Sequence, residues 1–293
     1  MSNMHLRNAR KTGRPAPLQF SEFLPPWRRR KARPFALLWA SALCAATALP
    51  LAADQWNKAF QVGAAPELRV ETSDANVTLR AANVNAIEAH VYTTGWRIGP
   101  GDVQVIDHQT GNLVEIEVKV PRLHFNFGNH RVDIDVQIPA TTKTGVHTGD
   151  GNIRADGLRG PARLTTHDGN IHGADFDGAL DASSGDGNID VRGKFSGLNL
   201  HSGDGNIVAE LAPGSHMAGS WTVESGDGNV TLRLPDGFAA DVDVHTGDGR
   251  ITLDVPVAAT GGIHENSVYG KLNGGGALLT VHTGDGSVRL ARL

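Results

Sequence analysis

A Gly-Asp-Gly turn recurs through the second half of this 293-residue chain and constrains its fold more than any other feature. From Asp150 to Asp204 the turn aspartates lie 18 residues apart, and the later gaps are 23, 21 and 37 residues. In one copy His167 replaces the first glycine. A recurring period of this length indicates a repeat architecture, because one such unit is too small to bury its own apolar face. The aspartates are Asp150, Asp168, Asp186, Asp204, Asp227, Asp248 and Asp285.

Apolar residues stand at fixed places around each turn aspartate. The position three residues after it is always Ile or Val: Ile153, Ile171, Ile189, Ile207, Val230, Ile251 and Val288. The position four before it is also apolar in every copy, from Val146 to Val281, and the positions between are mostly polar. Such alternation predicts strands with one face in a core and one in water. Helical periodicity is absent from the repeats, so we expect an all-β fold.

Two architectures fit a repeat of strand, turn and strand. Asp-Gly between alternating strands is a hairpin signal, which would give an antiparallel sandwich or meander. The other is a parallel β-solenoid with coils of about 18 residues, in which equivalent strands stack about 4.8 Å apart. Only the solenoid explains why one residue stays in register across the copies, because there it packs on its own equivalent. We therefore predict a single-domain β-solenoid, with the sandwich as the alternative.

A solenoid would place the turn aspartates in one column. Unit charges about 4.8 Å apart repel by roughly 1 kcal/mol per neighbour even in water. One solution is that each carboxylate accepts backbone N–H bonds within its own turn, while the asparagines two residues further on form an amide ladder. The alternative is bound calcium, since Gly- and Asp-rich coils bind this ion. Calcium-binding coils need acidic turns on both sides, and the second turn here carries no regular acid, so we expect no cofactor.

The amino terminus resembles an export signal. Residues 1–33 form a basic region that we expect to be disordered, and the apolar run 34–53 follows it. Cleavage is expected after Ala53, and an uncleaved membrane anchor is the alternative, because 20 residues can cross a bilayer. Cys44, the only cysteine, lies in this run. Either way the rest of the chain is predicted to lie outside the cytoplasm, in the periplasm or at the cell surface.

Residues 60–140 and the repeats 141–293 form the exported part. The first segment contains a degenerate copy of the repeat, Leu68 to Leu79, and we expect it to cap the amino-terminal end of the solenoid as an irregular β segment. The last copy ends at Leu290, so we expect an open strand edge there. The insertion from Pro256 to Gly276 would fold over this edge, and otherwise end-to-end self-association would follow.

The residues resemble a bacterial family known as the putative adhesin β-strand-repeat family, a domain of unknown function. The likeness lies in Leu68 to Leu79, Val132 to Pro139, the repeated Thr/Ser-Gly-Asp-Gly-Asn-Ile/Val unit and the ending Leu279 to Leu290. It covers roughly Phe60 to Leu293. The resemblance implies an envelope protein with an adhesive surface, and it carries over no catalytic or binding residues.

Candidate chemistry is sparse. His147, His201, His245 and His282 stand three residues before a turn aspartate and should face solvent, with His245 and His282 separated by an extra coil. Asp181, Asp190 and Asp243 can also face outward, but nothing in the sequence gathers them with an Arg or Lys in one cleft. No nucleophile elbow, phosphate-binding loop or His-Glu-x-x-His occurs. We assign no catalytic, cofactor-binding or metal-binding residues.

The leading hypothesis is an exported, non-enzymatic β-repeat protein that acts as a structural, adhesive or scaffolding element of the bacterial envelope. Its partner would be an envelope protein or polysaccharide. A net charge of −4, with the basic excess in the signal, argues against nucleic acid. A carbohydrate-binding or carbohydrate-active β-helix module and an extracytoplasmic sensory domain are the alternatives.

Overall fold

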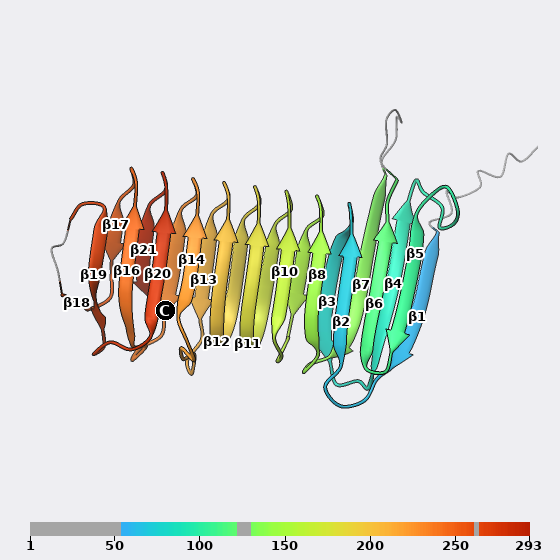
Figure 1. Ribbon diagram of the computed structural model, residues 1–293, viewed down its shortest axis with the longest axis horizontal. Helices are drawn as coiled ribbons and strands as arrows, with labels where there is room; N and C mark the ends of the chain where they lie inside the picture. The colour runs from blue at the N-terminus through green and yellow to red at the C-terminus, as the bar shows by residue number, and fades with distance from the viewer. Residues whose placement is uncertain (1–53, 122–129, 261–263) are drawn as a thin grey trace, which may run out of the picture. The chain divides into compact units, whose positions relative to one another are not determined.

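The computed structural model describes residues 54–121, 130–260 and 264–293. These residues form 21 strands and no helix. The strands build one hydrogen-bonded sheet that folds into two facing layers (Figure 1). Chains of alternating polarity need such a second layer, because each strand has an apolar face to cover.

The first layer contains the strands that precede the Asp-Gly turns, flanked at its two ends by strands that do not. Its strands, in spatial order, are β5 (Gln104–Thr110), β6 (Leu113–Lys119), β2 (Glu67–Thr72), β8 (Lys143–Thr148), β10 (Ala162–Thr166), the second parts of β11 (Ile171–Ser184) and β12 (Ile189–Ser202), β14 (Trp221–Ser225), β20 (Leu278–Thr283), β16 (Ala240–Thr246), β19 (Ser267–Leu272) and β18 (Val257–Ala259).

The second layer contains the strands that follow the turns, preceded at its amino-terminal end by strands that do not. Its strands, in spatial order, are β1 (Gln55–Gln61), β4 (Ala86–Thr94), β7 (Arg131–Pro139), β3 (Asn76–Ala82), β9 (Ile153–Asp156), the first parts of β11 and β12, β13 (Ile207–Leu211), β15 (Val230–Leu234), β21 (Val288–Arg292) and β17 (Ile251–Leu253).

The solenoid prediction is confirmed, and the sandwich is wrong for the repeats. Equivalent residues of consecutive copies are parallel register partners, as Ile171 is with Ile153 on one side and with Ile189 on the other. The strands β11 and β12 each pass from the second layer to the first, with a register shift after Gly173 that bends them around the edge opposite the turns. Each coil therefore closes through an Asp-Gly turn on one edge and an irregular bend on the other.

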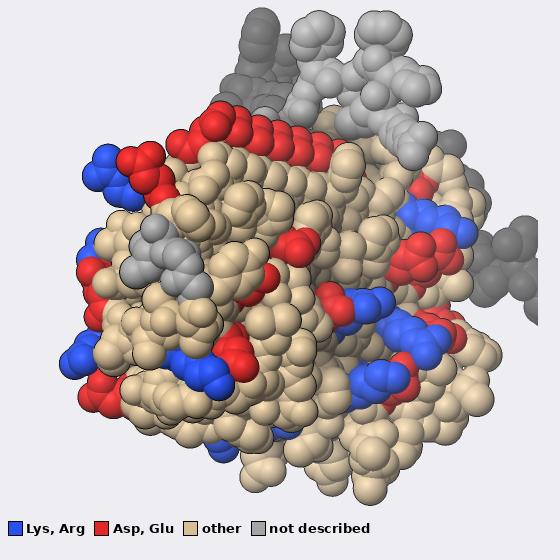
Figure 2. All heavy atoms as spheres, turned by 60° about the vertical axis from the view of Figure 1, so that its left-hand side comes forward, with Lys and Arg blue, Asp and Glu red and all other residues tan. Residues whose placement is uncertain are grey.

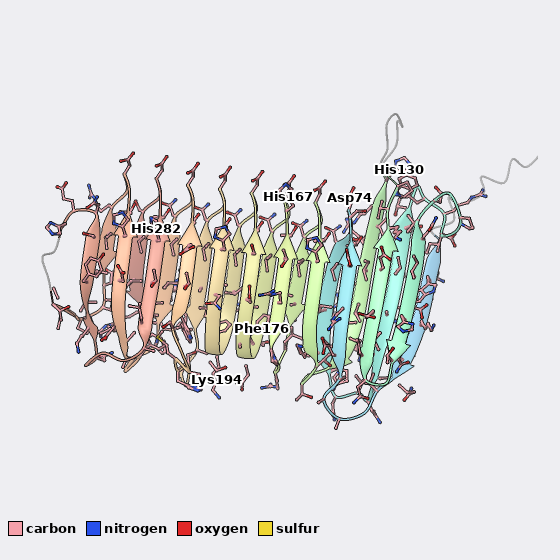
Figure 3. The ribbon with its side chains drawn as sticks, viewed as in Figure 1. Asp74, His130, His167, Phe176, Lys194 and His282 are labelled. Carbon is pink, nitrogen blue, oxygen red and sulfur yellow. The ribbon has the colours of Figure 1, made fainter. Side chains whose placement is uncertain are left out.

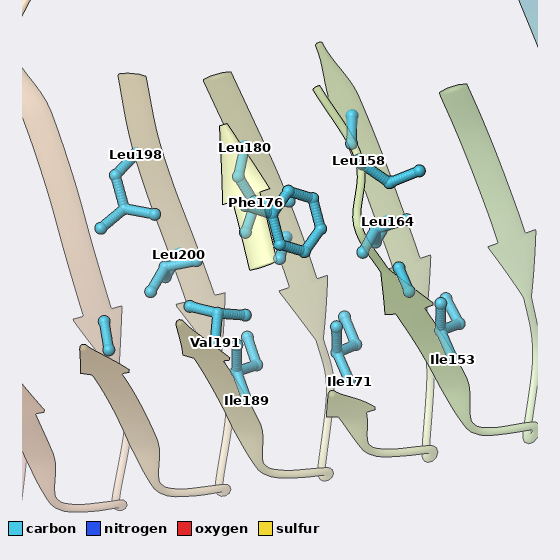
Figure 4. Packing of buried hydrophobic residues seen from close by; sticks show 14 of the residues in the cluster. Ile153, Leu158, Leu164, Ile171, Phe176, Leu180, Ile189, Val191, Leu198 and Leu200 are labelled. Carbon is cyan, nitrogen blue, oxygen red and sulfur yellow. The ribbon is translucent and has the colours of Figure 1, made fainter. Parts of the chain in front are cut away.

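The core consists of columns of the same kind of side chain. Isoleucines 153, 171 and 189 are buried and stack from coil to coil between the two layers (Figure 4). Where a column residue is small, a neighbour fills the space: a Cβ on Gly173 would lie 2.5 Å from the ring of Phe176. Phe176 in turn stacks on Phe195 with ring centres 6.1 Å apart.

The order of coils in space differs from their order in the sequence. The last copy does not end the stack, because β20 pairs with both β14 and β16, and β21 pairs with both β15 and β17. The expected open edge at Leu290 is therefore wrong. The insertion supplies β19, which pairs with β16, and β18, which pairs with β19. The chain thus passes the end of the stack and returns to insert its last two strands. Among the described strands, β17 is the exposed edge at this end of the second layer, and it is only three residues long.

The degenerate copy Leu68 to Leu79 is a complete coil of the stack. Its strands β2 and β3 lie between β6 and β7 on one side and β8 and β9 on the other. The cap expected from residues 60–140 consists of β1, β4, β5, β6 and β7, which are joined by three antiparallel pairings. Lys58 of β1 and Asp107 of β5 form an ion pair that links the two layers at this end.

Main-chain contacts leave no space for side chains at the second glycine of each turn. A Cβ built on Gly187 would lie 1.9 Å from the carbonyl oxygen of Gly169 in the coil before it. The corresponding distances at the other copies run from 1.8 to 2.1 Å. Ala75 occupies this position in the first coil, where the neighbouring strands β6 and β7 are joined by the longer segment 120–130. The glycine is therefore required by stacking rather than by its own dihedral angles.

A column of buried Ser and Thr hydroxyls, two residues before each aspartate, binds one turn to the next. The Ser184 hydroxyl accepts a hydrogen bond from the Gly187 N–H at 3.0 Å and donates one to the Gly169 carbonyl of the neighbouring coil at 2.8 Å. The same inter-coil donation occurs at all seven repeats: Thr148, Thr166, Ser184, Ser202, Ser225, Thr246 and Thr283. In the first coil the corresponding residue is Thr72, whose buried hydroxyl has no hydrogen-bond partner among the described residues.

The predicted asparagine ladder is confirmed. Each side-chain amide donates to the amide oxygen of the previous asparagine, at 3.0 to 3.2 Å. The ladder runs through Asn76, Asn152, Asn170, Asn188, Asn206 and Asn229.

Replacing Gly187 by Ala should destabilise the protein by about 3 kcal/mol or more, because the new methyl group would overlap a main-chain oxygen that has no freedom to move away. Urea unfolding measures the effect. Gly219→Ala is the matched control, since nothing lies within 4 Å of a Cβ at that position. An equal loss of stability in both variants would contradict the stacking explanation.

Ser184→Ala should cost about 1 to 3 kcal/mol, because it leaves a buried N–H and a buried carbonyl without their partner. The adjacent Ser183 is half-buried on the outer face of the same strand, so Ser183→Ala should change stability by less than about 0.5 kcal/mol. Thermal unfolding of the two single variants tests the difference.

Candidate functional site: the aspartate edge and the outer face of the first layer

Eight exposed carboxylates lie in one row along the turn side of the stack. We call this row the aspartate edge; in spatial order it contains Asp74, Asp150, Asp168, Asp186, Asp204, Asp227, Asp285 and Asp248. Figure 2 shows a continuous line of acidic side chains, and Figure 3 shows the row projecting away from the strands. Strand spacing of about 4.8 Å sets the separation of neighbouring charges.

The turns do not neutralise these carboxylates in the way we expected. Within the described residues the turn N–H groups bind the Ser and Thr hydroxyls and the carbonyls of the previous coil, and none donates to a turn carboxylate. The proposed backbone cap of each aspartate is therefore wrong. His167 lies 3.5 Å from the carboxylate of Asp168, and it is the only basic side chain paired with the row in this part of the chain. The carboxylates remain available to solvent and to partners.

Among the residues that the structure describes, no group of three or more His, Cys, Asp or Glu is placed to hold a metal ion. The calcium alternative for the turns stays untested.

Asp74 differs from the other members of the aspartate edge. It is the first of the row, next to the amino-terminal cap, and it lines a hollow of about 1090 Å³ together with Trp96 and Asp150. Although its side chain reaches solvent, the surrounding protein raises the pKa of its carboxyl group above 3.8, and the charge of Asp150 adds to this shift. Asp74 therefore takes up a proton more readily in the folded protein than in the unfolded chain.

The histidines lie in one outward-facing row of the first layer, but their neighbours differ from the prediction. His147 and His201 are exposed, and Glu224 lies beside His201 with 3.9 Å between the imidazole and the carboxylate. His245 and His282 are direct register partners, with ring centres 5.2 Å apart. The extra coil expected between these two is wrong, because the 37-residue gap is the excursion through β18 and β19.

The three acids considered for catalysis do not share a cleft. Asp181 and Asp243 lie on the outer face of the first layer, on strands separated by several others, whereas Asp190 lies on the second layer. Asp181 is paired with Arg163 of the neighbouring coil at 2.6 Å, a contact that follows from the 18-residue register although we did not predict it from the sequence.

A hollow of about 570 Å³ opens on the same face above Gly145. The strands beside it place Arg69 and Arg163 on either side of this glycine. Hydrogen bonds from Arg69 and Lys143 lower the pKa of Glu67 at its rim. The hollow therefore combines paired charges with an open sheet surface.

The signal and anchor predictions concern residues 1–53, which lie outside the described residues. In the part that the structure describes, no helix is long and apolar enough to span a bilayer.

The comparisons with known proteins found a family model that is similar to the carboxyl-terminal part of the chain. Residues 179–291 match the family model described as Toastrack DUF4097. No curated protein matches the chain. The resemblance noted from the sequence is supported for this segment, while the match says nothing about the Gly-Asp-Gly-Asn-Ile unit itself.

Three solved structures are similar at low identity. A protein described as a putative cell adhesion protein from Clostridium sporogenes is 12% identical, with 83% of this chain and 100% of that chain covered and a TM-score of 0.41. A putative adhesin from Parabacteroides merdae is 11% identical, with 82% and 97% covered and a TM-score of 0.42. A putative lipid binding protein from Parabacteroides distasonis is 13% identical, with 82% and 97% covered and a TM-score of 0.41. At TM-scores of this size these names describe those proteins alone.

Asp74→Asn should make the protein more stable than wild type at neutral pH. A carboxyl whose pKa is raised on folding favours the folded state when protonated, and that stability is lost as the pH rises from about 4 through the folded-state pKa. The variant has no carboxyl group at this position and does not lose this stability. The difference in the free energy of unfolding between the variant and the wild type should therefore shrink below pH 4. Urea unfolding at pH 3 to 7 checks it, with Asp236→Asn, outside the aspartate edge, as control. A constant difference across this range would contradict the assignment.

Proposed function

We propose that this chain is an exported, non-enzymatic β-solenoid that serves as a structural, adhesive or scaffolding element of the bacterial envelope. One observation carries the proposal: an aspartate carboxylate recurs at every turn along one edge of the stack. The coils of this stack are held together by hydrogen bonds from Ser and Thr side chains to main-chain carbonyls. Such an edge presents a regular array of identical groups rather than a single converging site.

The stack holds these groups at fixed separations. Each coil is bound to the next by strand hydrogen bonds, by a buried Ser or Thr hydroxyl and, for most coils, by an asparagine amide. A bound partner therefore meets carboxylates that are already in place, and the entropic cost of ordering them on binding is small.

Repetition supports adhesion through multivalency. A single exposed ion pair contributes about 0 to 1 kcal/mol, which is too little for stable attachment. Several such contacts made by one partner add up, because after the first contact the others form at high effective concentration. A partner with repeated cationic or hydroxyl groups, such as an envelope protein or a polysaccharide, suits this edge, whereas nucleic acid would be repelled by it.

The location follows from the apolar run 34–53, which is expected to direct the chain out of the cytoplasm. We propose that the solenoid works in the periplasm or at the cell surface. An uncleaved run would instead tether it to the inner membrane on the outer side.

Binding of the purified protein to isolated envelope fractions tests the proposal. Neutralising Asp186, Asp204 and Asp227 to Asn in one variant should reduce binding at least about tenfold while leaving the fold intact, because three adjacent contacts are lost together. Binding should also weaken as salt rises.

The control variant removes the same number of charges elsewhere, at Asp190, Glu210 and Asp236. It should bind as the wild type does. Equal losses in both variants would show that net charge alone matters, and unchanged binding in the first variant would remove the aspartate edge from the interaction.

A further inference from the structure

We propose that His245 and His282 form a binding site for one divalent transition-metal ion on the outer face of the first layer. This inference is independent of the proposed adhesive function. It arises from the order of the coils, because only the insertion of β20 between β14 and β16 brings these two histidines onto neighbouring strands.

The two rings are already separated by the distance that a shared metal ion requires. Their centres lie 5.2 Å apart, with an angle of 55° between the ring planes. A metal ion about 2.1 Å from one nitrogen of each imidazole lies about 3.2 Å from each ring centre, so a tetrahedral angle at the metal separates the centres by about 5 Å. Parallel strand pairing on both sides of β20 fixes the backbone positions of the two histidines.

The ring nitrogens are free to bind. Neither imidazole forms a hydrogen bond or an ion pair with the side chain or main chain of another described residue. His282 is exposed and His245 is half-buried, so an ion can reach both from solvent. Figure 3 shows His282 on the open face of the sheet, below the aspartate edge.

Carboxylates stand at the two adjacent positions of the same face. Glu224 is the register partner of His282 on the strand opposite β16, and Asp243 lies two residues before His245 on β16. As the side chains stand, neither completes a three-ligand site. Two imidazoles bind the ion, and water fills its remaining positions unless one carboxylate turns toward it.

The ligand type selects the ion. Imidazole pairs favour Zn²⁺, Ni²⁺ and Cu²⁺, whereas Ca²⁺ and Mg²⁺ require a shell of oxygen atoms. The bound ion would connect strands of two coils that are 37 residues apart in the sequence, and it should therefore stabilise the carboxyl-terminal end of the stack.

The test is to titrate the full chain, without a polyhistidine tag, with zinc. Calorimetry measures the binding, and thermal unfolding measures the melting temperature. We expect saturation of one site and a higher melting temperature with zinc but not with calcium. His245→Gln and His282→Gln should each weaken that binding about tenfold or more and abolish the thermal shift. Since both side chains lie at the surface, the metal-free variants should melt close to the wild-type temperature.

His147→Gln and His201→Gln are the matched controls, because these exposed histidines occupy the same outward row without a neighbouring histidine. They should bind zinc as the wild type does. With Cu²⁺, electron paramagnetic resonance should report two coordinating imidazole nitrogens in the wild type and one in each single variant at the pair. The proposal would be overturned if all four substitutions weakened zinc binding equally. It would also be overturned if zinc binding to His245→Gln and His282→Gln were unchanged.

Discussion

The close approach of successive turns is the constraint on which this structure depends. At each Asp-Gly turn the main chain of one coil lies directly against the main chain of the next, and the methyl group of even an alanine at Gly205 would overlap a carbonyl oxygen 2.1 Å away. This contact requires glycine, and the hydroxyl of Ser202 then binds the two turns together. A side chain in the turn therefore has one direction left, outward, which is why the aspartates form an exposed edge.

The same stacking explains why this repeat can change its order in space. Every coil offers its neighbour the same apolar columns, the same turn carbonyl and nearly the same hydroxyl, so contact surfaces are interchangeable. The last two strands can thus enter the stack beside β14 and β15 although β16 and β17 precede them in the sequence. Entry there buries both sides of β20 and leaves β17, of three residues, as the edge of the second layer. A short edge limits unwanted strand pairing.

The sequence was sufficient to predict the repeated part of the fold because each residue there packs on its own copy. Ile153, Ile171 and Ile189 could be assigned to one core column from spacing alone, and the asparagine ladder followed from the same register. The spatial order of the coils could not be predicted, since identical units carry no local signal that distinguishes one neighbour from another. The role of the buried Ser and Thr column was missed for a different reason: beside Gly and Asp these residues resemble ordinary turn residues.

The residues of the functional surface also fall into those that the repeat register predicts and those that depend on the order of the coils. Groups that recur in every coil, such as the turn aspartates, were placed correctly in one row, because their position depends on register alone. The pair that depends on which coils are neighbours was not, because His282 meets His245 across a 37-residue excursion. In a solenoid, a residue that recurs in every coil thus forms a row of equivalent side chains. The order of the coils determines which different side chains meet as a local pair. An ion or side chain that recognises such a pair would distinguish one coil from the others, which the aspartate edge by itself cannot do.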